Sequence, residues 1–382
     1  MTSSSRTRKD IKMIPVAEPA LDGNELAYLA DCIRSGWVSS KGAYIKRFEE
    51  SVAAWCGVQH GVVTSSGTSA LHLALLAVGV EPGDKVIVPA LTYVSTANVV
   101  AYTGARPTFV DADPATWNLD LAQLEAKITP RTKAIIPVHL YGHPIDMDTV
   151  MAIADRHGLS VVEDACEAHG SEYKGRQAGG LGHIGCFSFY GNKVVTTGEG
   201  GMLLTNSKDI ATAARSLRNQ ATEGDQYWHR RIGFSYRMTN LQAAVGLAQM
   251  ERIPQFVAAR RRLARLYDTL LADTPGLVRH VEPPWAKSVC WLYSLLVEDE
   301  FGMPRDDLIA YLARRDIESK PFFLPLPHLP AYDDRLSYPV AEHLSRCGIS
   351  LPSSVKLQPG QIEHIAGVIR EASRSKAPSN RR

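Results

Sequence analysis

Short apolar segments alternate with helix-like segments between residues 85 and 163, and this alternation constrains the fold more than any other feature. The segments that predict strands are residues 85–89, 106–110, 134–140 and 159–163, and those that predict helices are residues 93–101, 119–126 and 147–157. Strands that are apolar throughout are typical of parallel sheets covered by helices on both faces. The chain is therefore predicted to have an α/β fold, with ligands bound at the carboxyl ends of its strands.

The length of 382 residues exceeds the size at which a single core usually divides. We expect a large domain over residues 13–253, a smaller C-terminal α/β domain over residues 254–372, and polar tails at residues 1–12 and 373–382. An arginine-rich helix at residues 258–271 would connect the two domains. Its charges are expected to form a solvated face, made of Arg260, Arg261, Arg262 and Arg265.

Charge and cysteine content argue against several kinds of partner. The 42 basic and 40 acidic residues give a net charge of +2, which provides no electrostatic footprint for nucleic acid or a membrane surface. The six cysteines form no C-x-x-C pair, so we expect reduced thiols and no metal site. The sequence shows no apolar run long enough to span a bilayer and no signal peptide, which makes the cytoplasm the expected compartment.

A single lysine, Lys193, lies in a turn between two apolar segments, residues 187–190 and 201–205, that predict strands of a buried sheet. Glycines on both sides of this lysine accept unusual backbone angles. Such a turn can direct an amine into a cleft. The alternative is an ordinary surface lysine in a hairpin.

Small and hydroxyl-bearing residues open the apolar helix predicted at residues 70–77. Ser66, Gly67 and Thr68 would expose backbone N–H groups at the positive end of the helix dipole, where an anion such as phosphate is favoured. The alternative is that these residues are ordinary N-cap residues.

Asp164 follows the strand predicted at residues 159–163, so it and Glu163 place two carboxylates at the end of a buried strand. A buried carboxylate needs a cationic partner, which would be an arginine or a protonated heterocyclic nitrogen. A helix cap is a further alternative. The sequence therefore predicts a pocket for pyridoxal phosphate, which would be lined by Asp164, Lys193, the hydroxyl-bearing start of the helix and an aromatic residue.

Four motifs resemble the DegT/DnrJ/EryC1/StrS family of nucleotide-sugar aminotransferases, over a region from about Ile14 to the C-terminal part of the chain. The motifs are Ser66-Gly67-Thr68, EDACEAHG at residues 163–170, SFYGNK at residues 188–193 with GEGG at residues 198–201, and YRMTNLQAA at residues 236–244. The resemblance implies a type I aminotransferase fold, with a seven-stranded sheet in the large domain and pyridoxal 5′-phosphate as cofactor.

The resemblance also implies roles for individual residues. Lys193 would bind the cofactor covalently and then move a proton as a free amine, while Asp164 would pair with the pyridine nitrogen. Tyr93 would stack on the ring, although an aromatic residue after a strand also suits core packing. Glu167 would lie beside the phenolic oxygen, the alternative being an exposed loop carboxylate. The phosphate would be held by Ser66, Gly67, Thr68 and Ser188.

The family places Asn240 in the phosphate site of the opposite subunit, which implies a homodimer with composite active sites. The alternative for Asn240 is the N-cap of a helix predicted at residues 241–252. Candidate contacts to substrate are Trp37, Tyr93, Lys193 and His328, of which His328 can equally be a structural residue of a proline-rich loop.

The substrates that the resemblance implies are L-glutamate and a nucleotide-linked 4-keto-6-deoxyhexose, with GDP as the preferred nucleotide. Amination at C3, or of a dTDP- or UDP-linked sugar, remains open. The family also includes a dehydratase with histidine in place of the lysine, and Lys193 argues against that branch. A non-catalytic regulator that retains the fold is the alternative of a different class.

Overall fold

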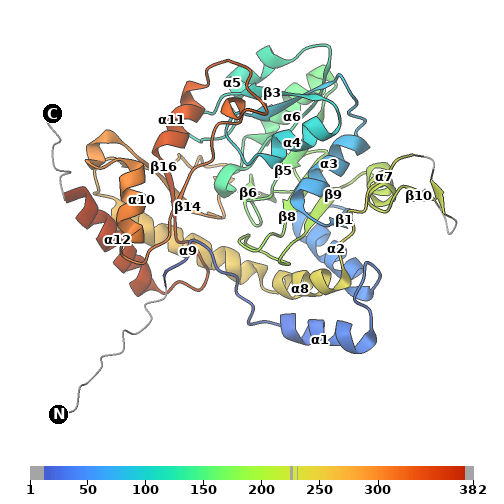
Figure 1. Ribbon diagram of the computed structural model, residues 1–382, viewed down its shortest axis with the longest axis horizontal. Helices are drawn as coiled ribbons and strands as arrows, with labels where there is room; N and C mark the ends of the chain where they lie inside the picture. The colour runs from blue at the N-terminus through green and yellow to red at the C-terminus, as the bar shows by residue number, and fades with distance from the viewer. Residues whose placement is uncertain (1–12, 224–226, 230, 375–382) are drawn as a thin grey trace.

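The computed structural model describes residues 13–223, 227–229 and 231–374, and its largest sheet has seven strands in the order β1-β9-β8-β5-β4-β2-β3 (Figure 1). Every neighbouring pair is parallel except the two pairs that include β9. The predicted α/β fold with a mostly parallel seven-stranded sheet is therefore confirmed. The strands are β1 (His60–Thr64), β2 (Lys85–Pro89), β3 (Arg106–Val110), β4 (Thr132–Ile135), β5 (Ser160–Asp164), β8 (Ile184–Ser188) and β9 (Gly201–Thr205).

The helices of the first 250 residues surround this sheet, as Figure 1 shows. They are α1 (Glu25–Ser35), α2 (Ala43–Cys56), α3 (Gly67–Ala77), α4 (Ser95–Tyr102), α5 (Leu121–Leu124), α6 (Met147–His157), α7 (Lys208–Arg218) and α8 (Asn240–Met250). Eight residues of helix α3 are buried, because the helix is apolar around most of its circumference. No helix in the described part of the chain combines the length and the apolar character needed to cross a lipid bilayer.

The prediction of a strand at residues 134–140 is wrong for residues 136–140. Strand β4 ends at Ile135, and beyond it only an isolated bridge joins Val138 to Asp164. A short 3-10 turn, Leu140–Gly142, follows, in which Tyr141 has a φ of 51°. The apolar residues of this stretch are buried by a loop rather than by a ladder, so their hydrophobicity could not distinguish the two.

A second, four-stranded sheet with the order β12-β14-β16-β15 lies in the C-terminal part of the chain. Figure 1 shows it beside the last helices, on one side of the seven-stranded sheet. The strands are β12 (Leu277–Val278), β14 (Tyr293–Val297), β15 (Lys320–Pro321) and β16 (Gly348–Leu351), and the helices are α9 (Ile253–Leu271), α10 (Arg305–Ala313), α11 (Pro339–Cys347) and α12 (Pro359–Arg374). Short strands complete the structure: β6 (Glu172–Tyr173), β7 (Arg176–Gln177), β13 (Ala286–Lys287), β10 (Thr222–Glu223) and β11 (Trp228–His229).

Helix α9 joins the two parts of the molecule. Phe256 and Val257 near its start belong to the main cluster of buried apolar residues, whereas Leu263 and Tyr267 belong to a second cluster shared with β14, β16 and α12. We propose that the domain division falls at this helix, close to the expected boundary between residues 253 and 254.

The expected solvated arginine face of α9 is wrong for two of its four residues. Arg260 is only 3% exposed, and its guanidinium donates a hydrogen bond to the carbonyl of Trp291. Arg261 donates to the carbonyls of Gly170 and Ser288. Arg262 and Arg265 are exposed. The helix therefore uses two of its arginines to hold loops of both parts of the chain, because guanidinium groups can satisfy several carbonyls at once.

The N-terminal segment packs against the C-terminal part of the chain rather than against its neighbours in sequence. The Ile14 N–H donates to the carbonyl of Asp316 (2.7 Å), and the Ile14 carbonyl accepts from the N–H of Glu318 (2.9 Å). The Val16 N–H donates to Oε2 of Glu318 at 2.8 Å, and the Val16 carbonyl accepts from the N–H of Ser353 at 2.8 Å.

Candidate active site

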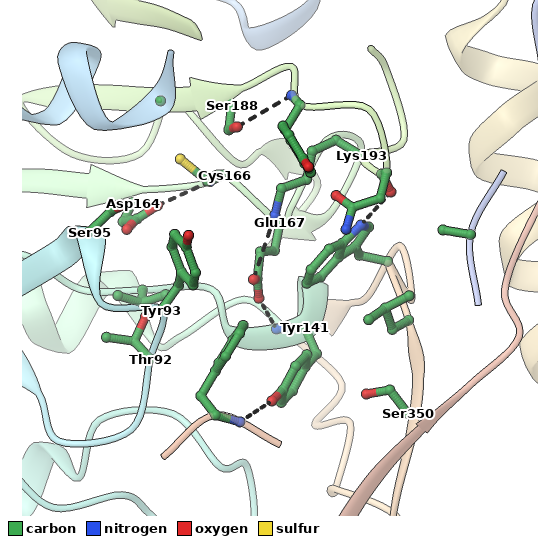
Figure 2. A pocket seen from close by; sticks show the side chains of 18 of the residues that line it. Thr92, Tyr93, Ser95, Tyr141, Asp164, Cys166, Glu167, Ser188, Lys193 and Ser350 are labelled. Atoms are coloured by element: carbon green, nitrogen blue, oxygen red, sulfur yellow. Dashed lines mark hydrogen bonds and ion pairs between the residues drawn. The ribbon is translucent and has the colours of Figure 1, made fainter. Parts of the chain in front are cut away.

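A cavity of about 520 Å³ lies where the carboxyl ends of β5 and β8 meet the N-terminus of α3 and the C-terminal sheet. Eight of the residues singled out in the sequence line it: Ser66, Gly67, Thr68, Tyr93, Asp164, Glu167, Ser188 and Lys193. Figure 2 shows the side chains of several of them directed into this space. Parallel strands place their carboxyl ends at one edge of the sheet, which is why residues so far apart in sequence meet here.

Lys193 points into the cavity and not to solvent. Its side chain is 11% exposed, and its Nζ lies 3.6 Å from Oε1 of Glu167 (Figure 2). The same Nζ lies 3.6 Å from the centroid of the Trp291 ring, a cation–π distance. The Trp291 indole N–H is fixed in turn by a 2.9 Å hydrogen bond to the carbonyl of Asn192. The surface hairpin considered as an alternative is therefore wrong.

Asp164 is buried at the end of β5 without a cationic side chain. Its Oδ2 accepts a 2.9 Å hydrogen bond from Oγ1 of Thr96, and its Oδ1 accepts from the N–H of Cys166 at 3.2 Å. Within the described residues, no lysine, arginine or histidine forms an ion pair with it. In the described part of the chain, Asp164 therefore has neither of the roles left open from the sequence, an arginine partner or a helix cap. A buried carboxylate without a protein cation suits a cationic ligand group, such as a protonated pyridine nitrogen.

The neighbouring Glu163 has a structural role instead. Its carboxylate accepts hydrogen bonds from Nε2 of His139 (2.8 Å) and from the N–H groups of Gly179, Leu181 and Gly182. Burial alone would raise the pKa of Glu163, but these bonds outweigh it and hold the pKa below the usual value. Glu163 therefore ties β5 to the loop that precedes β8, and it does not line the cavity.

Glu167 is buried against Lys193, so the exposed loop carboxylate considered from the sequence is wrong. Its Oε2 accepts a 2.8 Å hydrogen bond from the N–H of Tyr141, the residue with positive φ that follows β4. Burial raises the pKa of Glu167, and the attraction of Lys193 and the Tyr141 N–H lowers it less than burial raises it. The site thus pairs its lysine with an acid that burial makes easier to protonate.

The start of α3 combines a helix cap with an open anion cradle. Ser66 is the N-cap, and its hydroxyl accepts from the N–H of Ser69 at 3.1 Å. A Cβ on Gly67 would lie 2.7 Å from Cβ of Ser188, so only glycine lets the first turn approach that serine. First-turn N–H groups have no intrahelical partner. Both expectations for this segment therefore apply: Ser66 caps the helix, and the Gly67 and Thr68 amides remain available for an anion.

These features fit pyridoxal phosphate. The cavity offers an anion cradle at α3, a buried carboxylate at Asp164, a lysine amine, and an aromatic wall that includes Tyr93, whose ring centroid lies 5.8 Å from that of Phe323. In addition, Oδ1 of the lining residue Asn192 is buried and has no hydrogen-bond partner.

Three other candidates do not line this cavity. Trp37 is largely exposed on the loop after α1, and His328 pairs with Glu342 at 3.2 Å. Asn240 is buried: its Oδ1 accepts from the N–H of Tyr44 (3.1 Å), and its Nδ2 donates to the carbonyl of Trp37 (2.7 Å). The helix cap considered as the alternative for Asn240 is wrong, because Thr239 is the N-cap of α8. Because its amide group bonds to Tyr44, Trp37 and Cys32 of its own chain, we do not include Asn240 in the proposed phosphate site.

Sequence reasoning missed three residues of the wall that the C-terminal part contributes, namely Trp291, Glu318 and Ser350, whereas Lys320 and Phe323 belong to the proline-rich loop of the substrate candidate His328. No local pattern marks the three missed residues, since they reach the cavity only through the packing of the second sheet against the first.

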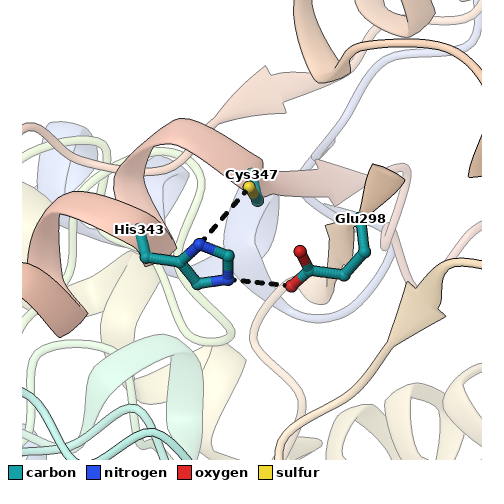
Figure 3. A group of neighbouring side chains, drawn as sticks. All are labelled: Glu298, His343 and Cys347. Atoms are coloured by element: carbon teal, nitrogen blue, oxygen red, sulfur yellow. Dashed lines mark hydrogen bonds and ion pairs between the residues drawn. The ribbon is translucent and has the colours of Figure 1, made fainter. Parts of the chain in front are cut away.

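One group of possible metal ligands, Glu298, His343 and Cys347, was found among the described residues, away from the cavity (Figure 3). Nε2 of His343 donates to Glu298 at 2.9 Å, whereas Nδ1 faces Sγ of Cys347 at 3.9 Å and accepts from Arg346 at 3.0 Å. The two ring nitrogens point in divergent directions, so one ion cannot bind His343 between both partners. We therefore describe this group as a hydrogen-bonded link between α11 and the end of β14.

Glu167→Gln should stabilise the cofactor-free protein at neutral and alkaline pH. Because the pKa of Glu167 is raised in the folded protein, the folded state holds this proton more tightly than the unfolded chain does. The protonated carboxyl group therefore stabilises the fold fully below its unfolded pKa, and this stabilisation is lost as the pH rises through the folded pKa. An uncharged amide avoids that loss. We expect a gain of roughly 1 kcal/mol at about pH 8 and no gain at about pH 4, measured by thermal unfolding.

Glu199→Gln is the matched control, because Glu199 lines the same cavity but is exposed. It should change stability equally little at both pH values. If Glu167→Gln instead lowers the melting temperature at alkaline pH, the ion pair with Lys193 outweighs burial.

Comparison with known proteins places the chain among sugar aminotransferases. The model of the DegT/DnrJ/EryC1/StrS aminotransferase family matches residues 19–370. GDP-perosamine synthase of Caulobacter vibrioides is 46% identical over 367 residues, covering 94% of this chain and 98% of the relative. A putative pyridoxal phosphate-dependent aminotransferase of Bacillus subtilis, EpsN, is 38% identical over 357 residues, covering 90% and 91% of the two chains.

A solved structure agrees with these relatives. The crystal structure of S. venezuelae DesV in complex with a ketimine intermediate superposes with a TM-score of 0.87 at 36% identity, covering 92% of this chain and 94% of that one.

Proposed function

The chain belongs to the DegT/DnrJ/EryC1/StrS aminotransferase family, and on this premise we propose that it transfers the amino group of L-glutamate to the 4-keto carbon of GDP-4-keto-6-deoxymannose, which yields GDP-perosamine. The observation that carries the chemistry is a buried lysine amine and a buried carboxylate without a protein cation in one cavity. The choice of sugar nucleotide rests on the nearly full-length relative named GDP-perosamine synthase. A regulator without catalytic activity would not need both groups.

Family membership implies pyridoxal phosphate as the cofactor. We propose that Ser188 and the amides of Gly67 and Thr68 hold its phosphate, Asp164 pairs with its ring nitrogen, and Tyr93 packs on its ring. When bound, the cofactor supplies an electron-accepting ring that stabilises negative charge on the substrate carbon.

Lys193 has two tasks in this proposal. Its Nζ would hold the cofactor covalently, and as a free amine it would take the proton from Cα of glutamate. Glu167 and the Trp291 ring then hold the resulting ammonium, since both lie 3.6 Å from the Nζ position. In the second half of the cycle, the same amine would give a proton to the C4 carbon of the sugar as that carbon receives the amino group.

The test is a substrate panel. The purified enzyme is incubated with L-glutamate and with GDP-, dTDP- or UDP-linked 3-keto and 4-keto 6-deoxyhexoses, and the aminated carbon is identified by NMR. We expect products aminated only at C4 of the GDP-linked sugar. Amination at C3, or of a dTDP or UDP sugar in preference to the GDP sugar, would contradict the proposed specificity and leave the aminotransferase activity intact.

We further propose that the enzyme is a homodimer whose sites lie next to the subunit contact. Large apolar side chains are exposed on α1 and the following loop, including Leu26, Ile33 (64% exposed) and Trp37, and α1 packs on α8 beside Asn240. Such an exposed apolar strip is typical of an interface.

The wild-type protein is expected to sediment at twice the chain mass of 41.8 kDa. Ile33→Glu should shift it toward the monomer, because a charge would then be buried in the contact. The matched control is Leu336→Glu, at another exposed apolar residue. A wild-type monomer, or an equal effect of both variants, would contradict the interface.

A further inference from the structure

The charge of the cavity does not match that of its proposed substrates. L-Glutamate carries two carboxylates and the sugar nucleotide carries a diphosphate, and both must enter the same space in turn. Among the described residues that line the cavity, four are acidic: Asp164, Glu167, Glu199 and Glu318. Only two are basic, Lys193 and Lys320. Within this chain, these two lysines are therefore the lining side chains that can offset the repulsion of an anionic substrate by the carboxylates.

Lys193 is not free for this purpose. Its amine lies between Glu167 and the Trp291 ring, and its proposed role requires it to exchange a covalent bond and a proton. An amine that is bound to the cofactor, or that must give up its proton, cannot act as a permanent cation. Lys320 remains.

Lys320 is held at the mouth of the cavity by the second sheet. It lies in β15 and pairs in register with Ser350 of β16, which also lines the cavity. Two residues that follow it, Pro321 and Phe323, continue the same wall, and the Phe323 ring contacts that of Tyr93. The backbone at this position is therefore fixed on the side of the cavity that faces the proposed cofactor ring.

The ammonium of Lys320 keeps its capacity to bind a ligand. Its Nζ lies 3.8 Å from Oε1 of Glu318, beyond hydrogen-bond distance, and its side chain is 53% exposed. The Glu318 carboxylate is anchored through its other oxygen by the N–H of Val16 at 2.8 Å. This arrangement attracts the lysine toward the cavity without using its three N–H donors, which suits a carboxylate or a phosphate oxygen.

We propose that Lys320 is the anion-binding residue for both substrates, and that it binds a carboxylate of the amino donor in one half-reaction and a phosphate oxygen of the sugar nucleotide in the other. This inference rests on the proposed function, because it requires two anionic substrates that alternate in one cavity. It assigns a specificity residue to the part of the cavity that lies away from the cofactor site. A neutral amino donor, or a sugar without its nucleotide, would lose this contact.

The test compares Lys320→Met with Lys174→Met. Lys174 is the matched control, since its side chain is also 53% exposed and also contacts a carboxylate, that of Asp148, but it does not line the cavity. The holoenzyme is used, and an unchanged visible spectrum of the bound cofactor shows that each variant is folded and loaded.

For Lys320→Met we expect the KM of glutamate in the first half-reaction and the Kd of GDP to rise about tenfold each, with the maximal rate of the glutamate half-reaction little changed. Both constants should also depend less on salt, because a contact between opposite charges is lost. Lys320→Arg should restore both constants, and Lys174→Met should leave them unchanged.

Unchanged constants in Lys320→Met, or equal changes in Lys174→Met, would overturn the inference, and a rise for only one of the two ligands would overturn the shared role. The proposed function is judged separately, from the product that the wild-type enzyme forms in the same preparation. A wild-type enzyme that aminates another nucleotide sugar refutes the GDP-perosamine assignment. The KM of glutamate in the first half-reaction still tests the role of Lys320 in that case.

Discussion

Lys193→Ala is expected to lower the rate of amino transfer by at least about 10³-fold, since it removes both the covalent attachment of the cofactor and the group that moves the substrate proton. The loss should appear in single-turnover experiments with glutamate, as the failure of 2-oxoglutarate to form. The band that reports the covalent link should itself be absent. The fold should survive, because the Lys193 side chain lines the cavity and its contact with Glu167 is long, at 3.6 Å.

Lys193→Arg separates the chemistry of the amine from its charge. An arginine keeps a cation near Glu167 and Trp291 but does not give up its proton at neutral pH. We expect this variant to be as inactive as the alanine variant. Substantial turnover by either one, or a borohydride-sensitive band that persists in the alanine variant, would refute the role of Lys193.

Asp164→Asn is expected to lower kcat by about 10²- to 10³-fold, because a buried charge aimed at the reacting system is replaced by a dipole of the same shape. Thr96 Oγ1 and the Cys166 N–H, which now donate to the carboxylate, hold the side chain in place. The measurement is the rate of the glutamate half-reaction at saturating glutamate and cofactor.

Asp111→Asn is the matched control for this prediction. Asp111 is also buried and follows β3, the strand at one edge of the same sheet, but it accepts hydrogen bonds from the N–H groups of Val340 and Ala341 and does not line the cavity. Its variant should lose stability and keep its kcat. Equal losses of kcat in the two variants would show that Asp164 matters only for the fold.

Local patterns predicted the main sheet and half of the site well. Strands β2, β3 and β9 and helix α6 begin and end where the hydrophobic pattern places them, because their apolar residues face the core in a regular period. The same patterns predicted the cofactor side of the cavity, since turn glycines, helix caps and strand ends leave signals within a few residues of the side chain that they position.

The remaining features depend on contacts between distant parts of the chain. Tyr141 has a positive φ and does not continue the expected strand. Its N–H donates a hydrogen bond to Glu167, which stabilises this carboxylate in its buried position. Arg260 resembles any other charge on an amphipathic helix until the Trp291 carbonyl is placed against it. Lys320 belongs to a segment with no catalytic pattern of its own. Such residues acquire their environment from tertiary packing, which a single sequence does not display.

The hydrogen bonds of Ile14 and Val16 have a consequence for the nascent chain. Val16 and its partner Glu318 are 302 positions apart, and the second partner of Val16, Ser353, comes later still. A ribosome therefore exposes the lysine turn and all of the main sheet long before the first segment of the polypeptide has anything to bind. Translation that stops before Trp291 leaves a product that has the cofactor side of the cavity but not its opposite wall, and the segment around Val16 meets its partner Ser353 only after that wall has been made.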